Sequence, residues 1–395
     1  MAEHSVIGPV DLLVLQPTPF CNIDCRYCYL ANRADSSKMS IDTFQKIMAE
    51  VEGSGYLAPN CLVLWHAGEP LVAPLEFYRA ASNHIQTLND RGLSLVQSIQ
   101  TNATLISEKW CDLFADEKIR ISVSLDGPAF IHDRNRVSRH GSGTHAASMR
   151  GVELLQKAGL EYNAICVLTD FSLDYPDEIY GFFEEAGVGY VGFNVEESEG
   201  CNISETFRTG NGLVQRFKRF LEKIYELQEK GSVRVREFLN VESNATKTVE
   251  AVDTDRLQKT TSLNRPLSIL TVDCNGNAAT FSPELLGTET PRYGKFFMAN
   301  LVSGSFADIL KSGLLSKAAR DIEEGKRLCR QECEYYCLCG GGAPSNKLSE
   351  NGTFATSTTQ YCQTQIIPAI DVALSGIESK LAREGKYELA RVAAL

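Results

Sequence analysis

The first 200 residues alternate between short apolar segments and amphipathic segments, and this alternation limits the fold more than any other feature. The apolar segments predict strands at Asp11–Leu15, Cys61–Trp65, Leu93–Ile99, Arg120–Leu125, Asn163–Leu168 and Gly189–Val195. The intervening segments predict helices that begin near Ser40, Pro74, Ser107, Ala146 and Pro176, and a longer helix over about Glu205–Lys230. Repeated βα units imply a parallel sheet with right-handed crossovers. Six units predict an α/β fold, a partial (β/α)6 TIM-like barrel that is open on one side.

Residues suited to chemistry follow each of the first four predicted strands. They are the cysteine run Cys21–Cys28, then Trp65–Pro70, Gln100–Asn102 and Asp126–Pro128. In barrels built from βα units, reactive groups gather at the carboxyl ends of the strands. The sequence therefore predicts one active site at this face of the barrel.

The run from Cys21 to Cys28 places three cysteines in a C-x3-C-x2-C spacing. Three thiolates can hold a four-iron cluster and leave one iron open, whereas most cluster motifs complete the shell with four cysteines. The alternatives are a structural zinc or a disulfide pair, but zinc usually takes four ligands in paired short spacings. An open iron can coordinate a small molecule, so the run indicates chemistry and not electron carriage alone.

Composition and charge restrict where the chain works and what it binds. It has 13 cysteines, no secretion signal and no apolar run of membrane-spanning length. These features predict a reducing, cytoplasmic location, where clustered thiols bind metal. The net charge of −11 argues against a nucleic-acid partner, and no membrane partner is expected. The isolated cysteines Cys61, Cys111, Cys166 and Cys201 are expected to be buried structural thiols.

The pattern changes after the sixth unit, and three parts are predicted. They are a barrel over residues 1–232, a polar linker or bridging segment over 233–264, and a cysteine-rich domain over 265–395. Leu267–Val272 and Ala278–Phe281 flank Asn275–Gly276, which predicts a β-hairpin. A helix over Ser305–Ala319, a second cysteine cluster and a C-terminal helix follow.

Taken together, these motifs resemble the radical S-adenosylmethionine (SAM) superfamily. The resemblance implies that Cys21, Cys25 and Cys28 hold a [4Fe–4S] cluster whose open iron binds SAM. The segment Ala67–Pro70 is similar to the Gly-Gly-Glu-Pro turn of the family, with alanine in place of the first glycine. The implied SAM-binding residues are Tyr27, Ala67, Gly68, Glu69, Pro70, Thr101, Asn102, Ser122, Ser124, Arg136 and Val167.

The C-terminal part resembles the SPASM extension, a module that carries auxiliary clusters in peptide-modifying members of the superfamily. The matching cysteines are Cys329, Cys333, Cys339 and Cys362, which implies one auxiliary [4Fe–4S] cluster. The spacing from Cys329 to Cys333 is one residue longer than usual, so Cys337 is an alternative ligand. Phe281 and Ala343 replace the cysteines that a second auxiliary cluster would need. Ser282 replaces the catalytic aspartate of sulfatase-maturing relatives, which argues against formylglycine formation.

Three segments are similar to one subgroup, the cyclophane-forming maturases of Gly-rich peptides called the GrrM/OscB group. They are Leu15–Cys21, Phe193–Glu197 and Cys339–Lys347. This similarity implies an oxidoreductase that acts on a ribosomally synthesised precursor peptide. A radical formed from SAM would abstract a side-chain Cβ hydrogen, and that carbon would bond to a nearby aromatic ring. Rearomatisation then releases a proton and an electron, and the auxiliary cluster is the expected electron acceptor.

The residues leave the base and the mode of peptide binding open. Glu196, Asp273 and Glu284 are candidate bases by region alone. The cysteine motif starts at residue 21, so no N-terminal leader-binding domain is expected. The precursor is instead expected at the open side of the barrel and at residues 233–264, through an added strand. A flavodoxin- or ferredoxin-type protein is the expected electron donor.

Other functions fit part of the pattern. A peptide epimerase would need a hydrogen-donating thiol, for which Cys274 and Cys337 are candidates, and thioether formation or side-chain oxidation needs the same cofactors. An iron–sulfur redox carrier or sensor is the non-enzyme alternative. The Gly-Glu-Pro turn and the loop arginines would have no purpose in a carrier.

Overall fold

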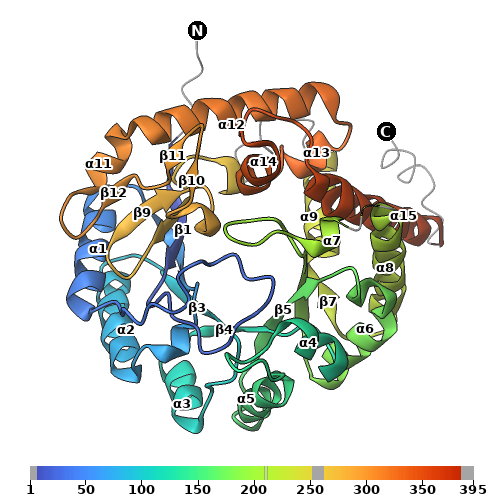
Figure 1. Cartoon of the computed structure of the whole chain (residues 1–395), viewed down its shortest axis with the longest axis horizontal. Helices are drawn as coiled ribbons and strands as arrows, with labels where there is room; N and C mark the ends of the chain where they lie inside the picture. Colours follow the sequence, from blue (N-terminus) through green and yellow to red (C-terminus); the bar gives the residue numbers. More distant parts are fainter. Residues whose placement is uncertain (1–6, 209, 211, 251–261, 384–395) are drawn as a thin grey trace.

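The computed structural model describes residues 7–208, 210, 212–250 and 262–383. Within them, ten strands form one curved sheet in the order β12-β9-β8-β1-β2-β3-β4-β5-β6-β7 (Figure 1). The strands from β1 to β7 are parallel to their neighbours, and β8 is parallel to β1. The predicted α/β partial barrel is therefore confirmed.

The strands are short, within the usual range of strand lengths in globular proteins. Those of the large sheet are β1 (Val10–Leu15), β2 (Leu57–Trp65), β3 (Val96–Thr101), β4 (Arg120–Ser124), β5 (Tyr162–Leu168), β6 (Tyr190–Val195), β7 (Arg234–Val235), β8 (Ile269–Val272), β9 (Asn277–Thr280) and β12 (Ala299–Asn300). A separate antiparallel pair consists of β10 (Glu289–Thr290) and β11 (Gly294–Lys295).

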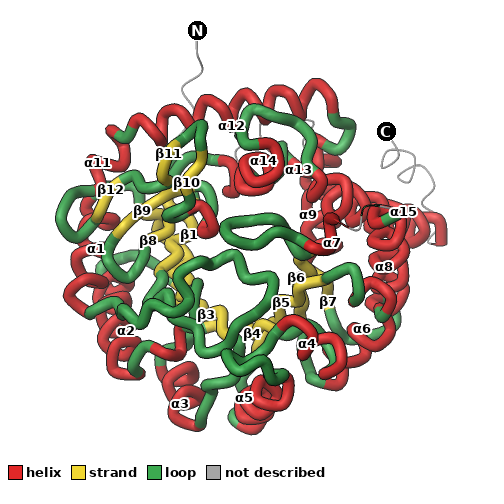
Figure 2. Tube along the Cα trace, in the orientation of Figure 1, coloured by secondary structure: helices red, strands yellow, loops and turns green. Residues whose placement is uncertain are grey.

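The helices fall into two sets. Those of the barrel are α1 (Ile41–Gly53), α2 (Leu75–Asp90), α3 (Glu108–Asp116), α4 (Ala129–Asn135), α5 (His145–Lys157), α6 (Pro176–Glu185), α7 (Glu205–Arg208), α8 (Leu213–Gln228) and α9 (Arg236–Glu250). Those of the C-terminal part are α11 (Phe306–Lys311), α12 (Gly313–Glu332), α13 (Tyr336–Cys339), α14 (Pro344–Asn351) and α15 (Ile367–Arg383). Figure 2 shows the helices as an outer layer around the strands. In Figure 1, α12 and α15 lie along the side that the barrel strands leave open.

Helix α1 illustrates how the sequence dictates the packing. Ser40 is its N-cap, and the Ser40 hydroxyl accepts a hydrogen bond from the Thr43 amide at 3.0 Å. One face of the helix is buried, as predicted from its periodicity, and Phe44 on that face packs against Trp65 of β2 with 5.6 Å between ring centroids. None of the helices in the described residues is long and apolar enough to cross a lipid bilayer.

Four expectations about individual elements were wrong. The predicted helix over Glu205–Lys230 is divided into α7 and α8, because Gly210 and Gly212 between them adopt positive φ angles of 61° and 77°. The predicted Ser305–Ala319 helix is likewise divided, since Ser312 is extended between α11 and α12. Helix α4 lies between the fourth predicted strand and the helix predicted near Ala146, where no helix was expected, and α9 lies in the segment expected to be a polar linker.

The C-terminal hairpin joins the barrel sheet. Leu12 to Leu15 of β1 pair in parallel register with Ile269 to Val272 of β8, across more than half of the chain. The hairpin therefore stands beside the cysteine loop that follows β1. Of the predicted bridging segment 233–264, residues 251–261 lie outside the described residues.

Candidate active site

The cysteine loop that follows β1 is anchored by backbone hydrogen bonds to the end of α4 and the residues after it. The amides of Asp24 and Arg26 donate to the carbonyls of Val137 and Asn135 at 2.7 and 2.9 Å. The three cysteines Cys21, Cys25 and Cys28 are all partly exposed, and none is in a disulfide. The loop is therefore held against the end of α4 and the segment that follows it, with its three cysteine residues only partly exposed.

The cysteine thiols need a cationic centre in order to ionise. Burial raises the pKa of Cys21 to about 12 and the pKa of Cys25 to about 11. The side-chain amide nitrogen of Asn102 lies 3.8 Å from the Cys21 sulfur, and an Arg136 guanidinium nitrogen lies 3.9 Å from the Cys25 sulfur. Within the described residues, no three His, Cys, Asp or Glu side chains are close enough to hold a single metal ion. A larger iron–sulfur core, which lowers thiol pKa and accepts amide donors, suits this donor set.

Glu69 connects the turn after β2 to the end of β3. Its carboxylate is 1% exposed and accepts hydrogen bonds from the Leu71 amide at 3.0 Å, the Thr101 hydroxyl at 2.7 Å and the Asn102 amide at 2.8 Å. Burial raises the pKa of Glu69 to about 7 despite these three donors. The turn also contains Pro70, whose carbonyl accepts from the buried Tyr78 hydroxyl at 2.7 Å. The turn is thus rigidly placed.

The turn before Glu69 depends on one glycine. Ala67 and Gly68 have φ angles of 68° and 66°, so the alanine that replaces the usual glycine adopts a left-handed conformation. A Cβ on Gly68 would lie 2.3 Å from the Thr18 carbonyl oxygen. The backbone of Gly68 therefore approaches the loop that carries the cysteines more closely than any side chain permits.

We expect Gly68→Ala to lower the free energy of unfolding by about 2 kcal/mol, through positive φ and the clash with Thr18. Ala67→Gly is the matched control, because it removes left-handed strain and no contact. It is expected to leave stability unchanged or to raise it by up to about 1 kcal/mol. Urea denaturation of both variants tests this, and equal losses in the two would contradict it.

A buried ion pair that the sequence alone did not reveal as part of the site lies after β4. Asp126 accepts a hydrogen bond from the Tyr27 hydroxyl, one from Arg136 at 3.0 Å and one from the Val167 amide at 3.0 Å. Arg136 is 6% exposed, and its Nε is buried with no hydrogen-bond partner in the described part of the chain. That unpaired donor fits an additional acceptor, such as the carboxylate of a bound small molecule.

The predicted serines on β4 have fewer contacts. Ser124 accepts a hydrogen bond from Gln100 at 2.8 Å, and Ser122 is paired with Gln100 in the sheet register. Both serines are half-buried. The sequence-predicted residues of the first five strand ends thus lie at one face of the barrel, as the βα pattern requires.

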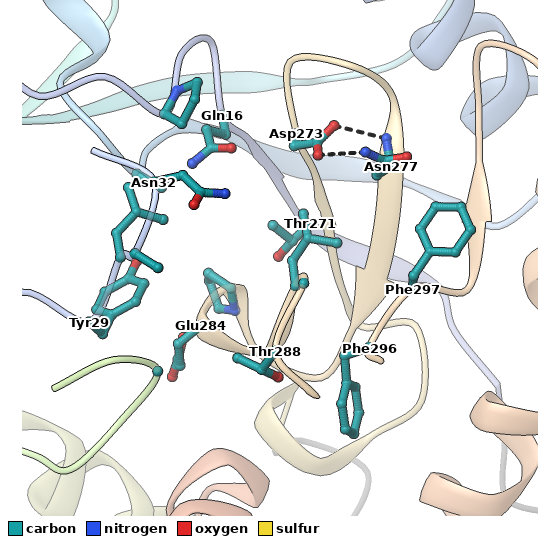
Figure 3. Close-up of a pocket in the computed structure, with 18 of the residues that line it drawn as sticks. Gln16, Tyr29, Asn32, Thr271, Asp273, Asn277, Glu284, Thr288, Phe296 and Phe297 are labelled. Atoms are coloured by element: carbon teal, nitrogen blue, oxygen red, sulfur yellow. Dashed lines mark hydrogen bonds between the residues drawn. The ribbon is translucent and has the colours of Figure 1, made fainter. Parts of the chain in front are cut away.

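A cavity of about 650 Å³ lies between the cysteine loop and the C-terminal hairpin. Tyr29 and Asn32 line it from the loop, whereas Thr271, Glu284 and Phe296 line it from the hairpin region (Figure 3). Thr271 is 2% exposed, and its hydroxyl has no hydrogen-bond partner within the described residues. The cavity combines aromatic walls with polar groups that remain available to a ligand.

The three candidate bases have different surroundings. Glu196 is buried and accepts from the Thr206 hydroxyl and the amides of Glu205 and Thr206, so it caps α7. Asp273 accepts from the backbone amides of Asn275 and Asn277 at 2.9 Å and so stabilises the hairpin turn. Figure 3 shows its bonds to Asn277. Glu284 is half-buried and lines the cavity, and no hydrogen bond to its carboxylate occurs among the described residues.

Two further carboxylates, Glu197 and Glu199, face one another after β6 and share a hydrogen bond. Burial, followed by the charge of Glu284, raises the pKa of Glu197 to about 8 and the pKa of Glu199 well above its usual range. The Asn346 amide of α14 donates to Glu197. The carboxyl groups of this pair are therefore protonated at neutral pH.

The raised pKa values predict that stability falls as pH rises. The folded chain binds these protons more tightly than the unfolded chain does, so the stabilisation is complete below about pH 4.5 and is lost towards pH 8. We expect Glu199→Gln to reduce this loss by about 2 kcal/mol. Urea denaturation between pH 5 and 8 is the measurement, and Glu178→Gln on the exposed face of α6 is the control. An unchanged pH slope in Glu199→Gln would contradict the assignment.

The C-terminal cysteines form a second site. Cys329, Cys333, Cys339 and Cys362 line one small cavity of about 40 Å³, and Cys337 is absent from its lining. The amides of Gly341 and Gly342 donate to the Cys339 sulfur. Cys337 instead donates to the Glu334 carbonyl at 3.8 Å. This arrangement fits the four cysteines first matched to an auxiliary cluster, with Cys329 rather than Cys337 among them.

The remaining cysteines divide into two groups. Cys61, Cys111, Cys166 and Cys274 are buried, and for the first three this was expected of structural thiols. The same expectation for Cys201 was wrong, because Cys201 is exposed, lines the large cavity and donates to the Cys28 carbonyl at 3.5 Å. No local pattern around Cys201 signals this position, since it depends on the approach of the loop after β6 to the cysteine loop.

Comparisons with known proteins agree with this geometry. The sequence model of the radical SAM superfamily matches residues 15–183. An uncharacterised protein of Synechocystis sp. is 42% identical over 380 residues, which cover 95% of this chain and 94% of that protein. The serine-type anaerobic sulfatase-maturating enzyme of Bacteroides thetaiotaomicron is 36% identical over 191 residues, which cover 47% of this chain and 46% of the enzyme.

Two solved structures share the fold. One is anSMEcpe with bound AdoMet, with a TM-score of 0.74, 21% identity and coverage of 93% of this chain and 98% of that one. The other is Streptococcus suis SuiB bound to its precursor peptide SuiA, with a TM-score of 0.62, 17% identity and coverage of 91% and 77%. These likenesses extend the comparison from the barrel to the C-terminal part of the chain.

Proposed function

Because this chain belongs to the radical SAM superfamily, we propose that it is a maturase of a ribosomally synthesised, Gly-rich precursor peptide. The reaction is the formation of a carbon–carbon cyclophane crosslink between an aromatic ring and a nearby side-chain Cβ. The observation that carries the proposal is the cavity between the cysteine loop and the hairpin. A peptide side chain bound there would contact both the cysteine loop, which holds the cofactor, and the Glu284 carboxylate. Ser282, in place of the sulfatase-maturing aspartate, supports a reaction other than formylglycine formation.

The cofactors are SAM and [4Fe–4S] clusters, as in the superfamily. Cys21, Cys25 and Cys28 hold the first cluster, and the unpaired Arg136 Nε and the rigid Glu69 turn suit the carboxylate and amino groups of SAM. When bound, this pair supplies reductive carbon–sulfur cleavage and hydrogen-atom abstraction.

The protein residues hold SAM in place. Asp126 fixes both Tyr27 and Arg136, so the aromatic ring and the guanidinium keep one orientation. The other SAM-binding residues lie at or near the carboxyl ends of β2 to β5. They are Ala67, Gly68, Pro70, Thr101, Asn102, Ser122, Ser124 and Val167.

The auxiliary site and the partners complete the proposal. Cys329, Cys333, Cys339 and Cys362 provide four ligands, so a cluster there has no open iron and serves as an electron acceptor. The precursor peptide reaches the cavity of about 650 Å³ rather than the open side of the barrel, along which α12 and α15 lie (Figure 1). A flavodoxin- or ferredoxin-type protein in the cytoplasm supplies the electron.

Co-expression with a Gly-rich precursor encoded beside this gene tests the proposal. We expect mass spectrometry to find a loss of two hydrogens for each crosslink and fragments in which ring and Cβ remain joined. Reduced, reconstituted enzyme should release 5′-deoxyadenosine from SAM, whereas a redox carrier would release none. A modified peptide without the two-hydrogen loss would refute crosslinking.

Cys201 favours epimerisation as the second candidate function. Its thiol is exposed in the cavity, whereas Cys274 is 4% exposed and Cys337 does not line this cavity. An epimerase would leave the peptide mass unchanged in H2O and add one deuterium in D2O, and Cys201→Ala would abolish that incorporation. A crosslinking enzyme would tolerate Cys201→Ala with its product unchanged.

A further inference from the structure

The auxiliary cysteine site contains a buried lysine whose one polar contact within the described part of the chain is a sulfur. Lys347 on α14 is 5% exposed, and its ammonium lies 3.3 Å from the Cys329 sulfur. Among the described residues, no Asp or Glu forms an ion pair with Lys347. Lys326 on α12 is a useful contrast, because it is 8% exposed and pairs with Glu323 at 2.8 Å.

An unpaired buried ammonium is costly. Burial of a charge without a counter-charge costs several kcal/mol or more, so a retained buried lysine needs a negative partner. The candidate counter-charge for Lys347 is the Cys329 thiolate together with the anionic cluster that the four cysteines hold. A [4Fe–4S] core with four thiolates carries net negative charge, and it therefore satisfies Lys347 where a neutral thiol would not.

The neighbouring backbone makes room for this ammonium. A Cβ on Gly325 of α12 would lie 3.1 Å from the Lys347 Nζ and 2.2 Å from the Phe354 carbonyl oxygen. Only a glycine therefore lets α12 approach the ammonium and this loop together. The position of Lys347 is a property of the packed fold, not of a side chain that can move to solvent.

A second set of donors faces the same site. The amides of Gly341 and Gly342 point at Cys339. Asn264, from before β8, donates to the Gly340 carbonyl at 2.9 Å and so fixes the glycine turn from the opposite side. The site thus presents one full positive charge and two amide dipoles to its sulfurs, and Lys347 is the largest single charge among them.

We infer that Lys347 raises the reduction potential of the auxiliary cluster and thereby sets it as an electron acceptor; this rests on the proposed function. The equilibrium is a one-electron reduction of the bound cluster, in which no atom is transferred. Reduction adds one negative charge close to Cys329, and an ammonium at 3.3 Å from that sulfur in a buried site stabilises the reduced form. Lys347 is therefore a positioning and tuning residue, not a catalytic one.

The test is a redox titration of the full-length chain, reconstituted with iron and sulfide and followed by electron paramagnetic resonance, with dithionite as reductant. A background of Cys21→Ala, Cys25→Ala and Cys28→Ala removes the first cluster and leaves only the auxiliary signal. We expect Lys347→Met to weaken reduction at least tenfold, which equals about 59 mV for one electron. Lys347→Arg and the matched control Lys326→Met should shift the equilibrium less than threefold.

Each outcome decides the inference. An auxiliary signal whose potential is the same in Lys347→Met and in the parent would overturn the inference and leave the proposed function standing. No iron in the triple-cysteine background would overturn the auxiliary site itself, and with it the inference. If Lys347→Met loses the cluster, Lys347→Gln is titrated in its place. Loss in both neutral variants with retention in Lys347→Arg supports the charge pairing, whereas loss in all three overturns it.

Discussion

Replacing Asp126 by asparagine is expected to lower the free energy of unfolding by about 3–5 kcal/mol. The side chains of Asp126 and Arg136 are 2% and 7% exposed, and they form an ion pair at 3.0 Å. Asparagine keeps the shape of the side chain but leaves the Arg136 charge buried without a counter-charge. It also weakens the acceptor of the Tyr27 hydroxyl and the Val167 amide. The same substitution should reduce SAM affinity, because Tyr27 and Arg136 lose their common support.

Urea denaturation of the parent, Asp126→Asn, Arg136→Met and the double variant separates the charge effect from the packing effect. Arg136→Met alone should also be strongly destabilising, and the double variant should lose less than the sum of the two, because the residues interact directly. Asp116→Asn is the control, since the Arg79–Asp116 pair is 47% and 60% exposed and should contribute less than about 1 kcal/mol. Additive losses, or equal losses for Asp116→Asn and Asp126→Asn, would show that the buried pair is not coupled.

Asp126 and Arg136 illustrate which features of the site can be predicted from sequence patterns and which cannot. The period of apolar residues predicted the strands and helices of the barrel, and Ser40 predicted the start of α1, because both signals are local. Asp126 was noted only as part of a turn after the fourth strand. Its role requires Tyr27 and Val167, which are distant in sequence and meet it only in the folded sheet.

Long-range pairing also explains the other differences. The hairpin strand β8 pairs with β1, and no sequence signal specifies which edge of the barrel a late strand joins. Glu196 and Asp273 were placed near the chemistry by region, but one caps α7 and the other stabilises a turn. A carboxylate near a helix start or a tight turn often bonds to backbone amides, and only coordinates distinguish this use from an available base.

Glu284 remains as the candidate base, and Glu284→Gln is expected to slow crosslink formation by about 10²–10⁴-fold. Rearomatisation of the attacked ring requires loss of a proton, and Glu284 is the one candidate that lines the cavity without a hydrogen bond in the described residues. Its charge also helps to raise the pKa of Glu197 and Glu199, which therefore stay protonated and leave Glu284 as the proton acceptor. Hydrogen abstraction does not need the base, so release of 5′-deoxyadenosine should continue within a few-fold of the parent rate.

Crosslinked peptide and 5′-deoxyadenosine measured in the same reaction give the decisive ratio. The parent enzyme should form them in step, whereas Glu284→Gln should release deoxyadenosine with little crosslink. Glu289→Gln is the matched control, because Glu289 lines the same cavity but is exposed on β10. A parallel fall of both products in Glu284→Gln would place this carboxylate in peptide binding instead. An unchanged crosslinking rate would show that the base is none of Glu196, Asp273 and Glu284. It would also show that the hairpin side of the cavity takes no part in the proton transfer.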